Sequence, residues 1–302
     1  MKLKFDVQGK SQPDPFIFED QGKLYLYVTA EQGVEAYSSD DLFSVWQYEG
    51  VVTQFRTGYA FWAPSVIYYQ GKYYMYVSFD TEDTFENLHV AVADSPLGPF
   101  MHEKRLFDHF SIDSHVVETE AGLFLWYVKE YLGPGRKGVR IYVDRLLDPW
   151  TPAYQPVEKV IPTFDEEIYP PNCKDGIIWH TIEGPFWLQH EGWQYVMYSG
   201  GCFQDDSYHI GYAAAKSDEP DLTKVEFIKH TDSGSFAPLL IKNAEEEGTG
   251  HNSVLFWNGA YYMVYHGRDL LPRSDGGYVE ARTARVRKME VQDGRLLLSS
   301  SI

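Results

Sequence analysis

The sequence contains five similar segments, and this repetition restricts the possible folds more than any other feature of the chain. Each segment is a short strand-like run, a turn that contains glycine, and a second run rich in aromatic residues, which is typical of a β-hairpin. The segments begin at Asp14, Ala63, Asp113, Glu183 and His251. Successive starts are 49, 50, 70 and 68 residues apart. A spacing near 50 residues fits one four-stranded blade of a β-propeller.

These repeats predict an all-β fold, a five-bladed β-propeller with four-stranded antiparallel blades around a central channel. No linker or change in composition divides the chain, so residues 1–302 are expected to form one domain. Weaker runs at 89–93 and 210–215 indicate third strands of blades. The extra residues of the two longer repeats, including the proline-rich stretch 148–171, are expected to be loop.

The two ends of the chain are expected to complete the ring. Residues 5–8 precede the first hairpin and could close the propeller beside the last blade. Near the other end, 282–291 and 295–298 have the character of two more strands around a turn at 292–294.

Charge and composition exclude some partners. The chain has 26 basic and 44 acidic residues, which gives a net charge of −18 at pH 7. Such a chain is repelled by nucleic acid and by anionic membrane surfaces, and no window of 18 apolar residues indicates a membrane span. Cys173 and Cys202 are too few for a disulfide framework. With no apolar run after Met1, we expect a cytoplasmic protein, and nothing in the sequence indicates its oligomeric state.

The first residues of the repeats carry most of the functional signal. In a propeller the innermost strand of each blade runs along the channel, so equivalent positions form a ring. Asp14, Asp113, Glu183 and His251 are expected to share that ring. Crowded carboxyl groups repel one another, which should raise the pKa of at least one. Aspartate also favours the turns where strands begin, but this alternative does not explain Glu183 or His251.

Glu183 stands in an apolar and aromatic stretch at 179–188. Such surroundings disfavour the ionised carboxyl, and a raised pKa is what a general acid needs near neutral pH. A surface glutamate in a turn is the alternative. Two carboxyls on opposite sides of a cleft suit glycoside hydrolysis, where one protonates the leaving oxygen and the other activates water or attacks carbon. Phe61 and Trp62 could supply an aromatic platform for a sugar, or could be structural.

Four short motifs resemble segments of glycoside hydrolase family 43, which comprises five-bladed propeller enzymes acting on arabinose- and xylose-containing glycans. These motifs are Gln12-Pro13-Asp14-Pro15, Phe61-Trp62-Ala63-Pro64, Ser111-Ile112-Asp113 and Ile182-Glu183-Gly184-Pro185. The resemblance implies an inverting mechanism with Asp14 as general base, Glu183 as general acid and Asp113 as a third carboxylate that raises the pKa of the acid and fixes its position. Inversion places the base and acid carboxyls roughly 6.5–9.5 Å apart.

The same resemblance extends to the last repeat. The segment 248–253 is similar to the family segment whose histidine lies beneath the site, near a calcium or sodium ion in many members. His251 would contact such an ion through water, and a structural histidine is the alternative. No cofactor is required for the chemistry. Arg282 resembles the family's active-site arginine, with Arg285 as the competing choice.

The resemblance implies a small oligosaccharide as substrate. Many relatives carry a further C-terminal β-sandwich that closes the cleft, whereas this chain ends soon after the fifth repeat. That difference favours an exo-acting α-L-arabinofuranosidase, with β-xylosidase and endo-arabinanase next. A non-catalytic sugar-binding propeller would need the aromatics but not three carboxyls. A fructosidase or glycan phosphorylase fits less well, because the first motif is Gln-Pro-Asp-Pro rather than Asn-Asp-Pro-Asn.

Overall fold

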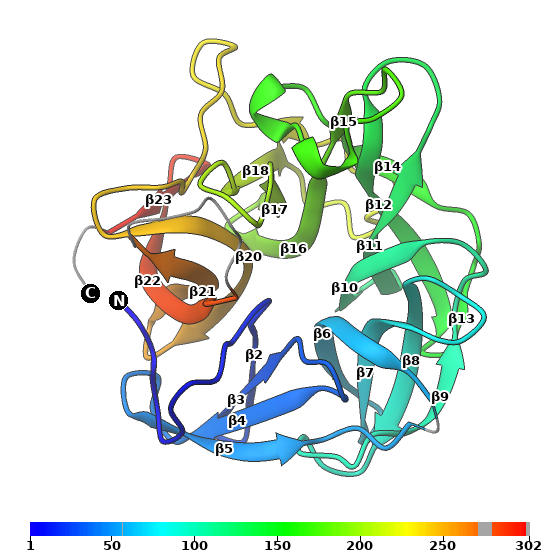
Figure 1. Ribbon diagram of the computed structural model, residues 1–302, viewed down its shortest axis with the longest axis vertical. Coiled ribbons are helices and arrows are strands. Elements are labelled where there is room, and N and C mark those ends of the chain that lie inside the picture. Colours follow the sequence, from blue (N-terminus) through cyan, green and yellow to red (C-terminus); the bar gives the residue numbers. More distant parts are fainter. Residues whose placement is uncertain (56, 271–279, 300–302) are drawn as a thin grey trace.

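The computed structural model describes residues 1–55, 57–270 and 280–299. Their strands form five sheets arranged as blades in a ring, which confirms the predicted five-bladed β-propeller (Figure 1). Within the described residues, helix is limited to two short 3₁₀ turns, η1 (Asp165–Glu167) and η2 (Pro170–Asn172). None of the helices in these residues has the length and apolar character needed to cross a membrane.

The first two blades follow the predicted hairpins closely. The first blade consists of β2 (Phe16–Asp20), β3 (Lys23–Val28), β4 (Glu35–Ser39) and β5 (Val45–Val51), with β1 (Lys4–Phe5) paired in parallel to β5. The second blade consists of β6 (Tyr59–Tyr69), β7 (Lys72–Asp80), β8 (Asn87–Ala93) and β9 (Met101–Arg105).

The third blade is larger than predicted. It consists of β10 (Ser111–Thr119), β11 (Gly122–Tyr131), β12 (Lys137–Asp148) and β13 (Thr151–Pro152), and β12 also pairs with β14 (Val157–Val160) and β15 (Trp179–His180). The prediction that 148–171 is loop was therefore wrong in part, since β13, β14 and both 3₁₀ turns begin there. Pro156 and Pro162 flank β14, where their missing N–H groups interrupt no strand pairing.

The last two blades have four strands each. The fourth consists of β16 (Ile182–His190), β17 (Trp193–Gly200), β18 (His209–Lys216) and β19 (Ile228–Lys229), and the fifth of β20 (Glu246–Trp257), β21 (Ala260–Asp269), β22 (Thr283–Gln292) and β23 (Arg295–Leu298). The ring closes slightly earlier in the chain than predicted. Residues 1–3 bond to β22, where Leu3 N–H donates to Ala284 and Met1 accepts from Val286, before β1 joins β5.

Apolar cores lie between neighbouring blades and hold the ring together. Trp126 of β11 and Val196 of β17 belong to one such core, and Trp46 of β5 and Val264 of β21 belong to another. All four side chains are fully buried, and each such burial contributes roughly 1.5–3 kcal/mol. The two cysteines do not form a disulfide. The blades are therefore held together by packing, and they fix the relative positions of their innermost strands.

The innermost strands share a backbone feature that positions the site. In β6, β10, β16 and β20 a β-bulge near the start of the strand interrupts the pairing with the next strand. The first bulged residue has a positive φ in each case, as does the residue two before β2: Asp14 (52°), Ala63 (47°), Asp113 (57°), Gly184 (60°) and His251 (49°). This set corrects the predicted alignment, because the fourth member is Gly184 and not Glu183.

The spacing between each turn glycine and its positive-φ residue explains why Gly184, and not Glu183, is the equivalent position. Gly22, Gly71, Gly192 and Gly259 each follow the positive-φ residue of their own hairpin by eight positions. Counted back from Gly192, the equivalent position is Gly184, and the catalytic candidate Glu183 lies one residue earlier. Glu183 is therefore paired in the ladder, opposite Ser199 of β17, while Gly184 occupies the bulge.

The bulges also connect the blades. A bulge leaves a backbone N–H without its ladder partner, and a buried N–H needs an acceptor. In four blades the N–H of the positive-φ residue donates to a side chain of the preceding blade: Asp14 to His266 Nδ1 (3.0 Å), Ala63 to Thr29 Oγ1 (2.8 Å), Gly184 to Asp113 Oδ2 (2.9 Å) and His251 to Ser199 Oγ (2.6 Å). These contacts fix the heads of neighbouring innermost strands against one another.

Substituting Gly184 tests this arrangement. A Cβ at Gly184 would lie 3.3 Å from the His251 ring, on a backbone that L-residues rarely adopt. Gly184→Ala should therefore lower the free energy of unfolding, measured with urea, by about 1–2 kcal/mol more than Gly22→Ala, and should also lower activity. Gly22 is the matched control, since it has a positive φ and open space around it. Equal effects of the two substitutions would contradict a packed ring.

Candidate active site

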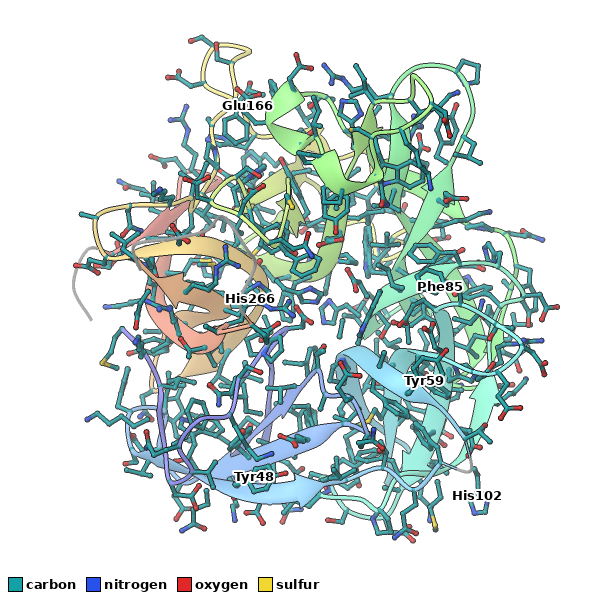
Figure 2. All side chains as sticks on the ribbon, viewed as in Figure 1. Tyr48, Tyr59, Phe85, His102, Glu166 and His266 are labelled. Atoms are coloured by element: carbon teal, nitrogen blue, oxygen red, sulfur yellow. The ribbon has the colours of Figure 1, made fainter. Side chains whose placement is uncertain are left out.

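One pocket collects the heads of the innermost strands. It is lined by Asp14, Thr29, Trp62, Ile112, Asp113, Glu183, Phe203, Tyr208, His251 and Arg282. All three predicted carboxylates lie in it, together with the predicted Trp62, Arg282 and His251. In Figure 2, His266, whose Nδ1 contacts the backbone N–H of Asp14, lies on the inner side of the fifth blade, whereas Tyr48 and His102 lie at the outer edge of the ring. Residues far apart in the sequence are thus brought to one place.

Asp14 is buried and held by three neighbours. Thr29 Oγ1 donates a 2.6 Å hydrogen bond to Asp14 Oδ2. The guanidinium of Arg282 lies 3.4 Å from Asp14 Oδ1, and His251 Nδ1 lies 3.4 Å from the same oxygen. The residue is 8% exposed, and it lines the pocket. The contacts leave Asp14 few orientations.

Burial by itself would raise the pKa of Asp14, but His251, Arg282 and His266 outweigh burial and lower that pKa well below its usual range. His266 Nδ1 lies 3.0 Å from the backbone nitrogen of Asp14 and 3.2 Å from Asp14 Oδ1. Burial lowers the pKa of both histidines, that of His266 to about 4. Arg282 therefore supplies the positive charge that persists beside Asp14 at neutral pH.

The surroundings of Glu183 shift its pKa in the opposite direction. Burial raises its pKa to about 7, with the charge of Asp14 adding to this and Tyr208 and Arg282 opposing it. Tyr208 donates a 2.6 Å hydrogen bond to Glu183 Oε1. One pocket thus contains a carboxyl that is ionised at neutral pH and a carboxyl that is still partly protonated there, which is the pairing that acid–base chemistry needs.

Asp113 is the third carboxyl that lines the pocket. Burial, and then the negative charges of Glu183 and Asp14, raise the pKa of Asp113 well above its usual range. Its Oδ2 accepts the Gly184 N–H, which opposes that rise and fixes the backbone next to Glu183. The ionised form of Glu183 therefore favours the protonated form of Asp113.

The predictions for the two aromatic residues Phe61 and Trp62 have different outcomes. Phe61 does not line the pocket: it is 3% exposed and packs in the core of the first two blades against Phe55 and Phe79, so the prediction of sugar contact was wrong. A strand presents successive side chains to opposite faces, and only Trp62 of the adjacent pair faces the pocket.

The two candidate arginines lie in different places. Arg282 lines the pocket, with its guanidinium 4.9 Å from the centre of the Phe203 ring and bonded to Glu280. Arg285 is buried elsewhere, where it pairs with Glu246 and Asp269 at 3.2 and 2.8 Å. The structure therefore places Arg282 at the site and gives Arg285 a role in packing the fifth blade.

His251 lines the pocket beside Asp14, and the structure offers few ligands for a cation there. Among the described residues, no group of three or more His, Cys, Asp or Glu side chains is arranged to hold a metal ion. A calcium or sodium ion at His251 would thus take most of its ligands from water.

Sequence reasoning missed Phe203 of the pocket and three polar residues of the site. Thr29 follows β3, Tyr208 precedes β18 and His266 lies in β21, all outside the inner strands on which the motifs were sought. Thr29 and His266 occupy corresponding places, each accepting the bulge N–H of the next blade. The repeats could have shown this position, because Ser199 occupies it in the fourth blade.

A second pocket adjoins the first. Trp62, Ile112, Glu183 and Phe203 line both, but Asp14 lines only the first. The inner pocket has a volume of about 150 Å³ and the second about 450 Å³. Glu183 therefore lies where a small pocket that contains Asp14 meets a larger pocket with space for a second part of a ligand.

Comparisons with known proteins address the family directly. The model for "Glycosyl hydrolases family 43" matches residues 7–296. The crystal structure of a thermostable family-43 glycoside hydrolase is similar with a TM-score of 0.80 and 29% identity, covering 99% of this chain and 96% of that chain. The chain therefore belongs to glycosyl hydrolase family 43, a family of glycosidases, as the motifs predicted.

Individual relatives are more distant. An extracellular exo-α-(1→5)-L-arabinofuranosidase of Cellvibrio japonicus is 25% identical over 282 residues, which are 84% of this chain and 78% of that protein. An α-L-arabinofuranosidase of Humicola insolens is 24% identical over 220 residues, or 68% of this chain. The matches span 42% of the Humicola insolens protein and 45% of a xylosidase/arabinosidase of Bacteroides ovatus.

The raised pKa of Glu183 has a consequence for stability. A carboxyl with a pKa of about 7 in the folded state and about 4.5 when unfolded binds its proton more tightly when folded. It therefore costs nothing below pH 4.5, and destabilises increasingly as the pH rises toward 7. Glu183→Gln removes this cost, so its stabilisation over the parent should grow by roughly 2 kcal/mol between pH 5.5 and 8.

Urea unfolding at the two pH values measures this difference. Glu118→Gln, at an exposed position of β10, is the matched control and should show no such growth. A pH-independent effect of Glu183→Gln would show that Glu183 is not held in a site that favours its proton.

Proposed function

We propose that this protein is an inverting, exo-acting glycoside hydrolase that releases terminal α-L-arabinofuranosyl residues from small arabinose-containing oligosaccharides. The observation that carries the proposal is the opposite tuning of two carboxyls in one pocket. The surroundings of Asp14 lower its pKa and those of Glu183 raise it to about 7. This division of roles is what hydrolysis of a glycosidic bond by acid and base requires.

Each carboxyl has a distinct task in this proposal. Asp14, ionised and held by Thr29 and Arg282, accepts a proton from the attacking water. Glu183 donates its proton to the glycosidic oxygen as the bond to the anomeric carbon breaks. Asp113 supports Glu183 by accepting a hydrogen bond from the adjacent Gly184 N–H. Water and leaving group occupy opposite faces of the sugar, which inverts the anomeric centre.

The shape of the site supports action at the end of a chain. The inner pocket, at about 150 Å³, is smaller than the roughly 300–1,000 Å³ typical of sites for larger ligands. It suits one sugar unit beside Asp14, with the remainder of the substrate in the adjoining pocket against Trp62. Glu183 lines both pockets, at the place where the bond between the two units would lie.

The choice of sugar is supported by relatives rather than by geometry. The Cellvibrio japonicus and Humicola insolens relatives are arabinofuranosidases. The Bacteroides ovatus relative is a xylosidase/arabinosidase, so β-xylosidase is the second candidate, and endo-arabinanase the third. The predicted cytoplasmic location fits imported oligosaccharides, and it stays a prediction.

A substrate panel on the purified protein tests the proposal. We expect kcat/KM for nitrophenyl α-L-arabinofuranoside to exceed that for nitrophenyl β-D-xylopyranoside by at least about tenfold, the scale of one or two contacts in a sugar pocket. Glu183→Gln should lower kcat/KM on arabino-oligosaccharides by about 10²–10⁴.

The outcomes separate the alternatives. A faster xyloside favours the second candidate. Binding of arabinosides, xylosides and galactosides without turnover would indicate a sugar-binding propeller. Full activity of Glu183→Gln on oligosaccharides, whose leaving groups need protonation, would rule out Glu183 as the acid.

A further inference from the structure

Tyr208 is one of the residues of the pocket that the family motifs do not account for. It lies between β17 and β18, it is 1% exposed, and its hydroxyl donates to Glu183 Oε1 at 2.6 Å. Burial and the neighbouring carboxylates raise the pKa of Tyr208 well above its usual range, so the phenol keeps its proton. Tyr208 is therefore a permanent hydrogen-bond donor to Glu183.

Residues of the fifth blade pack against the ring of Tyr208 and hold it in place. It stacks on His266, with ring centroids 5.6 Å apart and planes at 9°. On another side it fills the space that Gly250 leaves, since a Cβ at Gly250 would lie 1.9 Å from Tyr208 Cε1. Gly250 and His266 are paired across β20 and β21. The strands β20 and β21 of the fifth blade thus fix the direction of the Tyr208 hydroxyl, and the loop that carries Tyr208 does not.

This direction decides where Glu183 can carry its proton. A neutral carboxyl has one oxygen that accepts and one that bears hydrogen. Because Tyr208 donates to Oε1, that oxygen acts as the acceptor and the proton resides on Oε2. After Glu183 has given up its proton, the same hydrogen bond joins a phenol to a carboxylate and becomes roughly twice as strong. The contact therefore favours the state that proton transfer creates.

We propose that Tyr208 is a positioning residue for the acid Glu183, which directs the proton to Oε2 and stabilises the carboxylate left after transfer. The inference rests on the proposed function. In the step it assists, the proton on Oε2 passes to the glycosidic oxygen, and the electron pair of the breaking C–O bond leaves with that oxygen. Water forms the new bond to the anomeric carbon, and the proton of that water passes to Asp14.

Tyr208→Phe tests this role by removing one hydroxyl while keeping the ring on His266. Because the hydrogen bond from Tyr208 lowers the pKa of Glu183 against burial, its loss should move the alkaline limb of kcat/KM upward by roughly one pH unit. At the optimum, kcat on arabino-oligosaccharides should fall roughly tenfold. Rates on dinitrophenyl arabinofuranoside should change little, because that leaving group needs no proton.

Tyr195→Phe is the matched control. Tyr195 is a fully buried tyrosine of β17 whose hydroxyl has no hydrogen-bond partner among the described residues. Its substitution should leave the pH profile unchanged. A purely structural role for Tyr208 would lower the rates on both substrates together and leave the alkaline limb in place.

A second variant keeps the test decisive if Tyr208→Phe folds poorly. Incorporating 3,5-difluorotyrosine at position 208 keeps the ring and makes the hydroxyl a stronger donor, so the alkaline limb should move downward. Opposite shifts in the two variants support the inference. Unchanged limbs, with Glu183→Gln inactive on oligosaccharides, would overturn the role of Tyr208 alone. An active Glu183→Gln would instead overturn the proposed function on which it rests.

Discussion

The left-handed backbone turn at the head of each innermost strand is the constraint on which the rest of this structure depends. A positive φ at Asp14, Asp113 and His251 turns the chain at the pocket, and in four of the five blades the N–H of the positive-φ residue bonds to the preceding blade. These bonds join four of the five pairs of neighbouring blades. Carboxyls separated by up to 169 residues, from Asp14 to Glu183, are held in one pocket by this repeated bond.

Burial disfavours the ionised form of each of these carboxyls, and the neighbours of Asp14 and of Glu183 offset that effect to different extents. Asp14 has a guanidinium and a threonine hydroxyl as partners, which favour the ionised form. Glu183 has a phenol as its hydrogen-bond donor and the negative charge of Asp14 nearby, which leave the effect of burial dominant. Identical chemistry in the two side chains thus produces a base and an acid because their surroundings differ.

Much of the fold follows from local sequence signals. Hairpins with a glycine turn and aromatic second strands repeat five times, and their count and spacing are sufficient to predict the propeller. The small strands β13 and β14 were missed, because strands of two to four residues on the edge of a sheet carry little pattern of their own.

The site was less predictable where it depends on side-chain direction and on distant contacts. Phe61 and Trp62 are adjacent, and the sequence does not say which faces the pocket until the bulge is located. Glu183 was found by its motif, although the equivalent position of its repeat is Gly184. Tyr208 lies in a loop, and only the packing of the fifth blade reveals that its hydroxyl reaches Glu183.

The central claim, that environment divides the carboxyls into a base and an acid, can be measured without substrate. Carbon-13 NMR of protein labelled at the Asp and Glu carboxyls, assigned with Asp14→Asn and Glu183→Gln, follows each titration directly. The account predicts that Asp14 titrates below its usual range and Glu183 close to pH 7. A Glu183 resonance that titrates near pH 4.5, the ordinary value for glutamate, would contradict the account.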